Sequence, residues 1–166
     1  MIDIKKQARL AILLALSVIL SLVESIIPIF NGFIPGMKIG FANIVILFVL
    51  YKYTLKEAIL LSILRVFLVA ILISGLFTIT FAFSLTGAIL SGIIMGICKH
   101  FTKLSIIGVS TMGSISHSMG QLLIAYLFLA NNKIFYYFPF LLLLSTITGI
   151  CIGIITVQSY KRISNI

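Results

Sequence analysis

Long apolar runs fill most of this chain, and short breaks rich in glycine, proline or charge divide them. Runs of about 20 apolar residues have the length of a helix that crosses a bilayer. The pattern predicts an all-α protein with six transmembrane helices in a single membrane domain, residues 1–166. The expected helices cover residues 8–28, 39–52, 57–74, 82–98, 105–129 and 136–158.

Two segments depart from this simple pattern. The run 39–52 is short for a full crossing, so we expect its start, GMKIG, to be unwound or tilted. The uncharged stretch 75–83, GLFTITFAF, is too short for a span. We expect it to turn at the membrane surface.

Composition supports the membrane assignment. The chain is 61% hydrophobic and 9% charged, with a mean hydropathy of +1.30, whereas soluble domains carry about 25% charged residues. The N-terminal sequence MIDIKKQAR before an apolar run is similar to a signal peptide. The apolar run is too long for one, however, and no A-x-A cleavage site follows. We therefore interpret it as the first transmembrane helix and expect no soluble domain.

The net charge of +9 comes from basic residues that the predicted topology places mainly on one side. Nine lie at the termini or in the second and fourth connections: Lys5, Lys6, Arg9, Lys52, Lys56, Lys99, Lys103, Lys161 and Arg162. The opposite side has Lys38 and Lys133, and Arg65 lies within the third helix. Basic loops face the cytoplasm, so the distribution predicts cytoplasmic termini in a cell-membrane protein and makes a nucleic-acid partner unnecessary.

Small residues recur at four-residue spacing, which lets helices approach closely in lipid. The sets are Ala11 and Ala15, then Ala88, Gly92 and Gly96, then Gly149 and Gly153. Internal packing explains each of them.

Five strongly polar residues lie inside the predicted helices: Glu24, Asn43, Arg65, His117 and Gln121. Ionisable residues in a bilayer are expensive and usually functional. At about 1.5 Å per residue, four of the five lie in the outer half, and the long Arg65 side chain reaches it. His117 and Gln121 share a helix face. We expect a polar pocket that opens to the outside.

The segment 29–38 follows the first helix and bends sharply at its glycines and prolines. The residues expected to form a lid over the pocket are Asn31, Gly32, Pro35 and Gly36, with Lys38 as a charge on the rim.

The same polar and aromatic residues have structural interpretations as well. Glu24 and Arg65 are also explained by a structural ion pair, and His117 by ordinary packing. Aromatic residues at the outer boundary fit an interfacial belt or a surface that stacks on a planar ligand. They are Phe30, Phe33, Phe77, Phe81, Tyr136 and Tyr137.

The motifs of several enzyme classes are missing. The three acidic residues, Asp3, Glu24 and Glu57, form no DDxxD-like cluster for the magnesium ions of diphosphate chemistry. The chain has no Walker A motif, GxSxG or HExxH, and Cys98 and Cys151 make no zinc pattern. The sequence therefore predicts no catalytic residues, metal or cofactor.

The chain resembles the Gx transporter family, also called heptaprenyl diphosphate synthase component I. The resemblance rests on LVESIIP, IPGMKIGFANIVILF, LLSILRVFLVAIL, SLTGAILSGIIMGICK, IIGVSTMGSISHSMGQLLIA and STITGICIGII. Ser118 departs from it, because asparagine is expected after the histidine.

The family is similar to the S components of energy-coupling factor transporters. That similarity implies six helices, solute binding beneath the first external loop, and association with a transmembrane coupling protein and two ATPases. By the same resemblance, Ala11 and Ala15 would contact the coupling protein. Glu24 would form a wall of the pocket and Asn43 would donate or accept a hydrogen bond.

Three functions are compatible with the sequence. The first is the solute-binding subunit of an importer, whose small-molecule solute is anionic or planar and aromatic. The second is a non-catalytic accessory component of polyprenyl diphosphate synthesis, as the family name implies. The third is a purely structural membrane protein.

Overall fold

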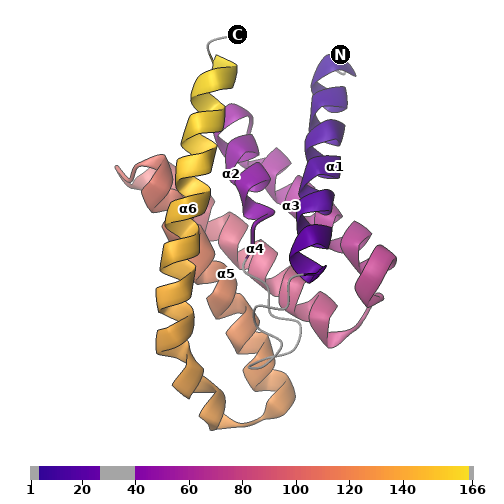
Figure 1. The fold of residues 1–166 in the computed structure, drawn as a ribbon, viewed down its shortest axis with the longest axis vertical. Helices are drawn as coiled ribbons and strands as arrows, with labels where there is room; N and C mark the ends of the chain where they lie inside the picture. Colours follow the sequence, from indigo (N-terminus) through magenta and orange to yellow (C-terminus); the bar gives the residue numbers. More distant parts are fainter. Residues whose placement is uncertain (1–3, 27–39, 165–166) are drawn as a thin grey trace.

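The computed structural model describes residues 4–26 and 40–164, which form a bundle of helices without strands (Figure 1). The α-helices are α1 (Ile4–Ile26), α2 (Asn43–Lys52), α3 (Leu55–Val69), α4 (Ile79–Phe101), α5 (Ile106–Leu129) and α6 (Phe138–Ser164). A π-helix, η1 (Ala70–Ser74), continues α3, and a 3₁₀-helix, η2 (Asn132–Tyr137), precedes α6. The all-α prediction and its six helices are confirmed within these residues.

The expectation that residues 75–83 form a surface turn is wrong for its second half. The turn is confined to the residues before α4, which begins at Ile79. Thr78 starts this helix because its side chain accepts a hydrogen bond from the backbone N–H of Phe81 at 3.2 Å. A side-chain cap of this kind satisfies an N–H that the helix leaves open.

The second helix begins four residues later than the predicted position 39. Gly40 has φ +93°, which lies outside the helical region and favours glycine. The chain makes a turn there, with the N–H of Asn43 bonded to the carbonyl of Gly40 at 2.8 Å. At ten residues, α2 is about 15 Å long, half the thickness of a bilayer core.

Four helices of the described chain are long and apolar enough to cross a membrane. They span Ile4–Ile26, Leu55–Ser74, Ile79–Phe101 and Lys133–Arg162. Helix α5 has sufficient length, but its serines, glycines, His117 and Gln121 make it more polar. The protein is therefore a membrane protein, and complete crossings by α2 and α5 stay predictions.

Helix α1 reverses the arrangement of a soluble amphipathic helix. Its buried face carries Ser17, Ser21 and Glu24, whereas Ile12 and Ile19 on the other face are 69% and 55% exposed. In water this pattern would be unstable, but lipid solvates the apolar face. The polar face is therefore directed into the bundle.

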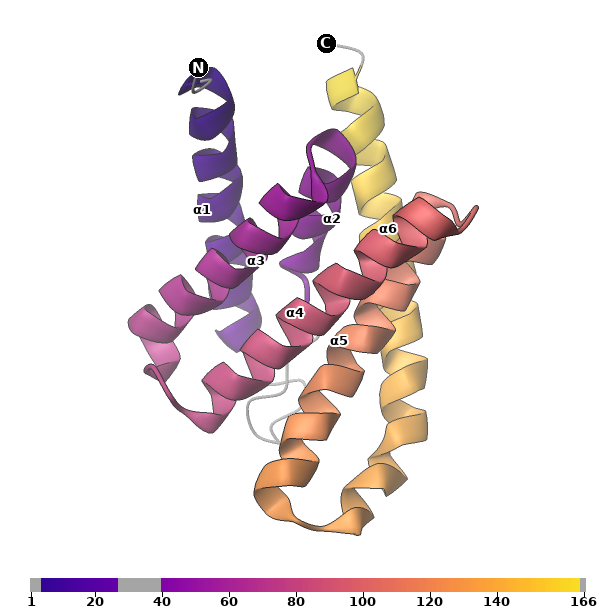
Figure 2. The ribbon, with the colours of Figure 1, turned by 180° about the vertical axis from the view of Figure 1, so that it is seen from behind.

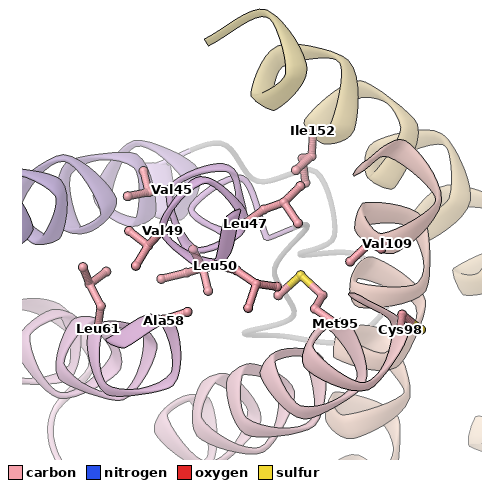
Figure 3. Close-up of a cluster of buried hydrophobic side chains, with 11 residues drawn as sticks. Val45, Leu47, Val49, Leu50, Ala58, Leu61, Met95, Cys98, Val109 and Ile152 are labelled. Atoms are coloured by element: carbon pink, nitrogen blue, oxygen red, sulfur yellow. The ribbon is translucent and has the colours of Figure 1, made fainter. Parts of the chain in front are cut away.

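Helix α2 lies at the centre of the main apolar core. Every residue from Val45 to Leu50 is buried, which explains why this helix is apolar on all sides. Figure 3 shows its side chains among those of α3, α4, α5 and α6. The packed residues labelled there are Val45, Leu47, Val49, Leu50, Ala58, Leu61, Met95, Cys98, Val109 and Ile152.

Helices α5 and α6 pack closely through glycine. A Cβ added at Gly149 would lie 2.6 Å from the Cα of Thr111, and one at Gly153 would lie 2.7 Å from the Cα of Ile107. The hydroxyl of Ser110 donates a hydrogen bond to the carbonyl of Gly149 at 2.7 Å. The prediction that Gly149 and Gly153 serve helix packing is confirmed.

The first turn of α1, the last turn of α6 and the α2–α3 connection lie toward one end of the bundle, while η1 and η2 lie toward the other (Figures 1 and 2). Lys6 of α1 forms a salt bridge with Glu57 of α3 at the first end. The ammonium of Lys99 donates a hydrogen bond to the carbonyl of Leu50 at 2.6 Å. Much of the positive charge thus belongs to one end of the molecule.

Candidate functional site

A polar cavity lies where α1, α3, α4 and α5 meet, at the end of α1 that is distant from its basic first turn. Its lining residues come from six segments: Ser21, Glu24, Gly40, Arg65, Val66, Val69, Ala70, Ser74, Phe81, Ser84 and His117. Its volume is about 20 Å³, which is room for about one water molecule.

Glu24 and Arg65 bring opposite charges to this cavity. They are 6% and 4% exposed, and the Arg65 guanidinium experiences the charge of the Glu24 carboxylate. One oxygen of that carboxylate accepts a hydrogen bond from the backbone N–H of Gly40 at 2.5 Å. The positive φ of Gly40 turns this N–H toward α1, so a local backbone feature holds the acidic side chain in place.

His117 reaches the cavity because α4 has no side chain opposite it. A Cβ at Gly87 would lie 2.8 Å from Cε1 and 2.9 Å from Nδ1 of the imidazole. The other ring nitrogen, Nε2 of His117, lies 3.0 Å from Nε2 of Gln121, one helical turn later. Gly120 also lets α5 approach α4 closely, since its Cβ would lie 3.0 Å from the Cα of Gly87.

Asn43 is buried beside the cavity without lining it. A Cβ at Gly40 would lie 2.9 Å from the Nδ2 of Asn43 and 3.7 Å from Cδ2 of His117. The Nδ2 of Asn43 and the Oε1 of Gln121 have no hydrogen-bond partner among the described residues. Buried polar atoms without a partner are uncommon. These two amide groups can therefore form further hydrogen bonds next to the cavity.

The residues expected from the sequence therefore fall into three groups. Glu24, Arg65 and His117 line one cavity. Asn43 and Gln121 lie behind it and contact its wall through Gly40 and His117. Lys38 and the expected lid residues Asn31, Gly32, Pro35 and Gly36 lie outside the described residues.

Besides the apolar lining residues Val66, Val69 and Ala70, five residues that contribute a polar group or space to the site were missed. Ser21, Ser74 and Ser84 contribute hydroxyls to the lining, and Gly40 and Gly87 provide the space and the N–H group described above. Ser21 precedes Glu24 by three residues, so helical periodicity alone could have found it. The other four depend on which helices become neighbours.

Phe30 and Phe33 lie outside the described residues, and the other outer aromatic residues divide between the two interpretations. Phe77 and Tyr136 are 92% and 85% exposed, as members of an interfacial belt are. Phe81 is buried and lines the cavity, and its ring centroid lies 5.3 Å from that of Phe67. Of the described aromatics, Phe81 alone lines the cavity and is placed to contact a ligand there.

Ala11 and Ala15 are both exposed on α1, so the internal-packing explanation for this pair is wrong. The reason is the orientation of α1, whose inward face carries serines and Glu24. Ala11 also borders an apolar groove of about 230 Å³ between α1 and α3. Glu57 lies at this groove, and the other lining residues are Leu10, Leu14, Leu60, Leu61 and Leu64.

The cavity combines a cation, an anion, an imidazole and three hydroxyls within an apolar protein. A guanidinium presents five N–H donors in a fixed geometry that matches carboxylate and phosphate groups. Hydroxyls both donate and accept hydrogen bonds. Such a set can bind a compact polar group and hold it away from lipid.

Comparison with known proteins identifies one family. Residues 13–158 match the family described as heptaprenyl diphosphate synthase component I. No curated protein and no solved structure matches the chain.

Proposed function

The chain belongs to the heptaprenyl diphosphate synthase component I family, and we propose that it is a membrane-embedded substrate-binding subunit that captures a small solute for import. The observation that carries the proposal is the convergence of Glu24, Arg65 and His117, from three different helices, on one buried cavity. Ionisable side chains at such positions are costly in a membrane, and those that occur usually serve binding or transport.

A structural ion pair alone accounts for less of the site. It would explain Glu24 and Arg65, but it requires neither the imidazole of His117 nor the hydroxyls that face the same space. It also leaves no reason for Gly87, whose lack of a side chain admits the imidazole. A binding cavity accounts for all of these features together.

The solute should be compact at its polar end and carry a group that Arg65 can bind. With a volume of about 20 Å³, the cavity admits about one water molecule. Capture of an organic solute therefore requires the surrounding segments to move apart. Phe81 on the lining would contact an apolar or planar part of the same solute.

The proposed orientation has both termini in the cytoplasm and the cavity toward the outside. It is supported by the basic residues that the α1–α3 and α2–α4 contacts bring to one end, since basic segments face the cytoplasm. In this orientation the exposed pair Ala11 and Ala15 lies in the cytoplasmic half. We propose this face of α1 as the contact for a transmembrane coupling protein that works with ATPase subunits.

The family description supports a second candidate function. It names a component of heptaprenyl diphosphate synthase, and a component need not be catalytic. In this role the chain would hold a soluble prenyl synthase at the membrane.

Native mass spectrometry of the protein purified in mild detergent from its own host tests the proposal. The comparison is between the unmodified protein, Arg65→Ala, and Arg9→Ala as the matched control. Arg9 is an exposed arginine at the basic end of α1, so its loss changes the charge without touching the cavity.

A bound small molecule that is present in the unmodified protein and in Arg9→Ala, and lost in Arg65→Ala, would support solute capture and identify the solute class. Retention of that molecule by Arg65→Ala would show that the cavity is not its site. Co-purification of a prenyl synthase without any small molecule would favour the accessory role instead.

A further inference from the structure

The apolar groove between α1 and α3, which we call the α1–α3 groove, faces away from the core of the bundle. Its aliphatic walls are formed by Leu10, Ala11, Leu14, Leu60, Leu61 and Leu64. Leu60 and Leu64 are exposed, so the groove is open to the surroundings of the protein. In a membrane those surroundings are lipid chains, which are as apolar as leucine.

The groove begins at the charged end of the two helices and extends toward their apolar part. Glu57 lines it in the first turn of α3, and Leu64 lies seven residues later, from 57 to 64. At about 1.5 Å per residue, this length is about 10 Å, or about a third of the thickness of a bilayer core. The groove therefore matches the first part of an acyl chain that enters the bilayer from its surface.

The acidic side chain at the groove is neutralised within the protein. The Glu57 carboxylate forms a salt bridge with Lys6. It also accepts hydrogen bonds from the backbone N–H and the hydroxyl of Thr54, at 2.9 and 3.0 Å. Glu57 therefore adds little repulsion toward an anion at this end of the groove.

The segments around this end carry a surplus of positive charge. Residues 1–9 and 52–57 contain five basic side chains, Lys5, Lys6, Arg9, Lys52 and Lys56, and two acidic ones, Asp3 and Glu57, so their net side-chain charge is +3. Arg9 is exposed and precedes Leu10. Lys56 is exposed and precedes Glu57. Two of the basic residues thus adjoin residues that line the groove.

We propose that the α1–α3 groove binds one anionic phospholipid, with an acyl chain between the two helices and the phosphate beside Arg9 and Lys56. Basic pockets between transmembrane helices bind anionic headgroups, and each Lys or Arg near the membrane surface adds to the attraction. A zwitterionic phospholipid has the same chains but no net charge. The charge of the headgroup therefore decides which lipid the groove prefers.

Ala11 belongs both to this groove and to the face of α1 that we assign to a coupling protein. A lipid in the groove would cover part of that face and would leave when the coupling protein binds. The lipid site itself rests on α1, α3 and their charges. It depends neither on import nor on the polar cavity.

Native mass spectrometry of the full chain in detergent measures the preference. The protein would be titrated with phosphatidylglycerol and, separately, with phosphatidylcholine of the same acyl chains. The double variant Arg9→Gln with Lys56→Gln removes two charges beside the groove. Lys161→Gln with Arg162→Gln is the matched control, because these exposed residues lie in the last turn of α6, a helix that does not line the groove.

Two further variants test the site of the acyl chain. Ala11→Phe fills part of the groove, whereas Ala15→Phe adds the same side chain to α1 at a residue that does not line it. Both alanines are exposed, so neither substitution disturbs the core. If Ala11→Phe does not fold, Ala11→Leu makes the same test with a smaller side chain.

The unmodified protein should bind its first phosphatidylglycerol about fivefold or more tightly than phosphatidylcholine, which is about the effect of one basic residue near the membrane surface. Arg9→Gln with Lys56→Gln should lose this preference, and Lys161→Gln with Arg162→Gln should keep it. Ala11→Phe should weaken the binding of both lipids, because the chain loses its contacts in the groove. Ala15→Phe should leave both unchanged.

Three results would overturn the proposal. The first is equal affinity for the two lipids. The second is an equal loss of preference in the two charge variants, which would indicate general attraction to the basic end of the bundle. The third is unchanged lipid binding in Ala11→Phe, or in Ala11→Leu if that variant replaces it, which would place the acyl chain elsewhere.

A prenyl diphosphate is the alternative occupant, because it also joins an apolar chain to an anionic group. Farnesyl diphosphate would be added to the protein loaded with phosphatidylglycerol at equal concentration. Retention of the phospholipid supports the proposal. Its displacement would assign the groove to a prenyl diphosphate instead.

Discussion

The carboxylate of Glu24 accepts a hydrogen bond from the backbone N–H of Gly40, sixteen positions further along the chain. This bond joins the last turns of α1 to the turn before α2, beside the guanidinium of Arg65. It depends on the φ of +93° at Gly40, which other residues rarely adopt. The acidic side chain of the site is thus held by backbone geometry.

Gly40→Ala should disrupt this contact. The new Cβ would lie 2.9 Å from Nδ2 of Asn43, and positive φ disfavours alanine, so we expect a loss of about 1–3 kcal/mol in stability. Gly75→Ala is the matched control, because Gly75 also has a positive φ, +78°. Its Cβ would meet the Thr78 side chain at 3.4 Å, which is an ordinary contact without crowding. Thermal unfolding of the two variants should separate crowding at the site from backbone strain. Equal losses would show that the contact with Asn43 is unimportant.

Gly87→Ala should displace the imidazole of His117. The added methyl would lie 2.8 Å from Cε1 and 3.1 Å from the backbone oxygen of His117, and overpacking of this kind costs about 1–3 kcal/mol. On the same helix, Gly92→Ala meets Ile59 at 3.4 Å and should be nearly neutral. Thermal unfolding measures the difference, and similar melting temperatures would contradict the tight approach at Gly87.

Gly149→Ala should separate α5 from α6. Its Cβ would meet the Cα of Thr111 at 2.6 Å, and backbone cannot yield as a side chain can. We expect a loss of about 3 kcal/mol or a failure to accumulate as folded protein. In Gly108→Ala the Cβ meets the flexible side chain of Leu104 at 3.2 Å, so this variant should fold. Size-exclusion chromatography in detergent distinguishes the two outcomes.

The charged residues at the two ends of the bundle, Lys6 with Glu57 and Arg65 near Glu24, should contribute differently to the free energy of unfolding. Lys6 and Glu57 form a salt bridge with side chains that are 38% and 20% exposed, so Lys6→Ala should cost about 0–1 kcal/mol. Arg65→Ala removes a buried guanidinium whose charge acts on the buried Glu24 carboxylate, and should cost about 3–5 kcal/mol. Chemical unfolding of both variants would measure this contrast. Equal costs would mean that the Arg65 charge is well solvated.

Cysteine labelling tests the proposed orientation. In a variant in which Cys98 and Cys151 are replaced by serine, Lys133→Cys should react with an impermeant maleimide from outside the cell. Lys103→Cys should react only after the membrane is opened, because it lies in the α4–α5 connection, which we assign to the cytoplasm. The reverse pattern would place the cavity on the cytoplasmic side.

Most of the site could be anticipated as a set of residues, but not as an arrangement. Glu24, Arg65 and His117 are conspicuous because charge is rare in apolar helices, and each was found without knowledge of its neighbours. Ser74, Ser84 and Gly87 are unremarkable in sequence, since small and hydroxyl-bearing residues are common in membrane helices. Only the approach of α3 and η1 to α4 and α5 gives them a place at the cavity.

The alanine pair on α1 shows the same distinction. Four-residue spacing indicates that Ala11 and Ala15 share a helix face, but it does not say which way that face is directed. The rotation of α1 is set by the burial of Ser17, Ser21 and Glu24, which forces the alanines outward. Their exposure therefore follows from competition between two faces of one helix.

The sequence by itself determined the membrane class, the six helices and the candidate charged residues. These properties depend on the local sequence. The free energy of transferring an apolar run or a charge into the bilayer is set mainly by that segment itself and not by its neighbours in the fold. Three features were decided by the tertiary structure alone. They are the central position of α2, the hydrogen bond from the Gly40 N–H to Glu24, and the arrangement of six segments around one cavity. Those features depend on helix rotation and close approach, which arise from packing between residues distant in sequence.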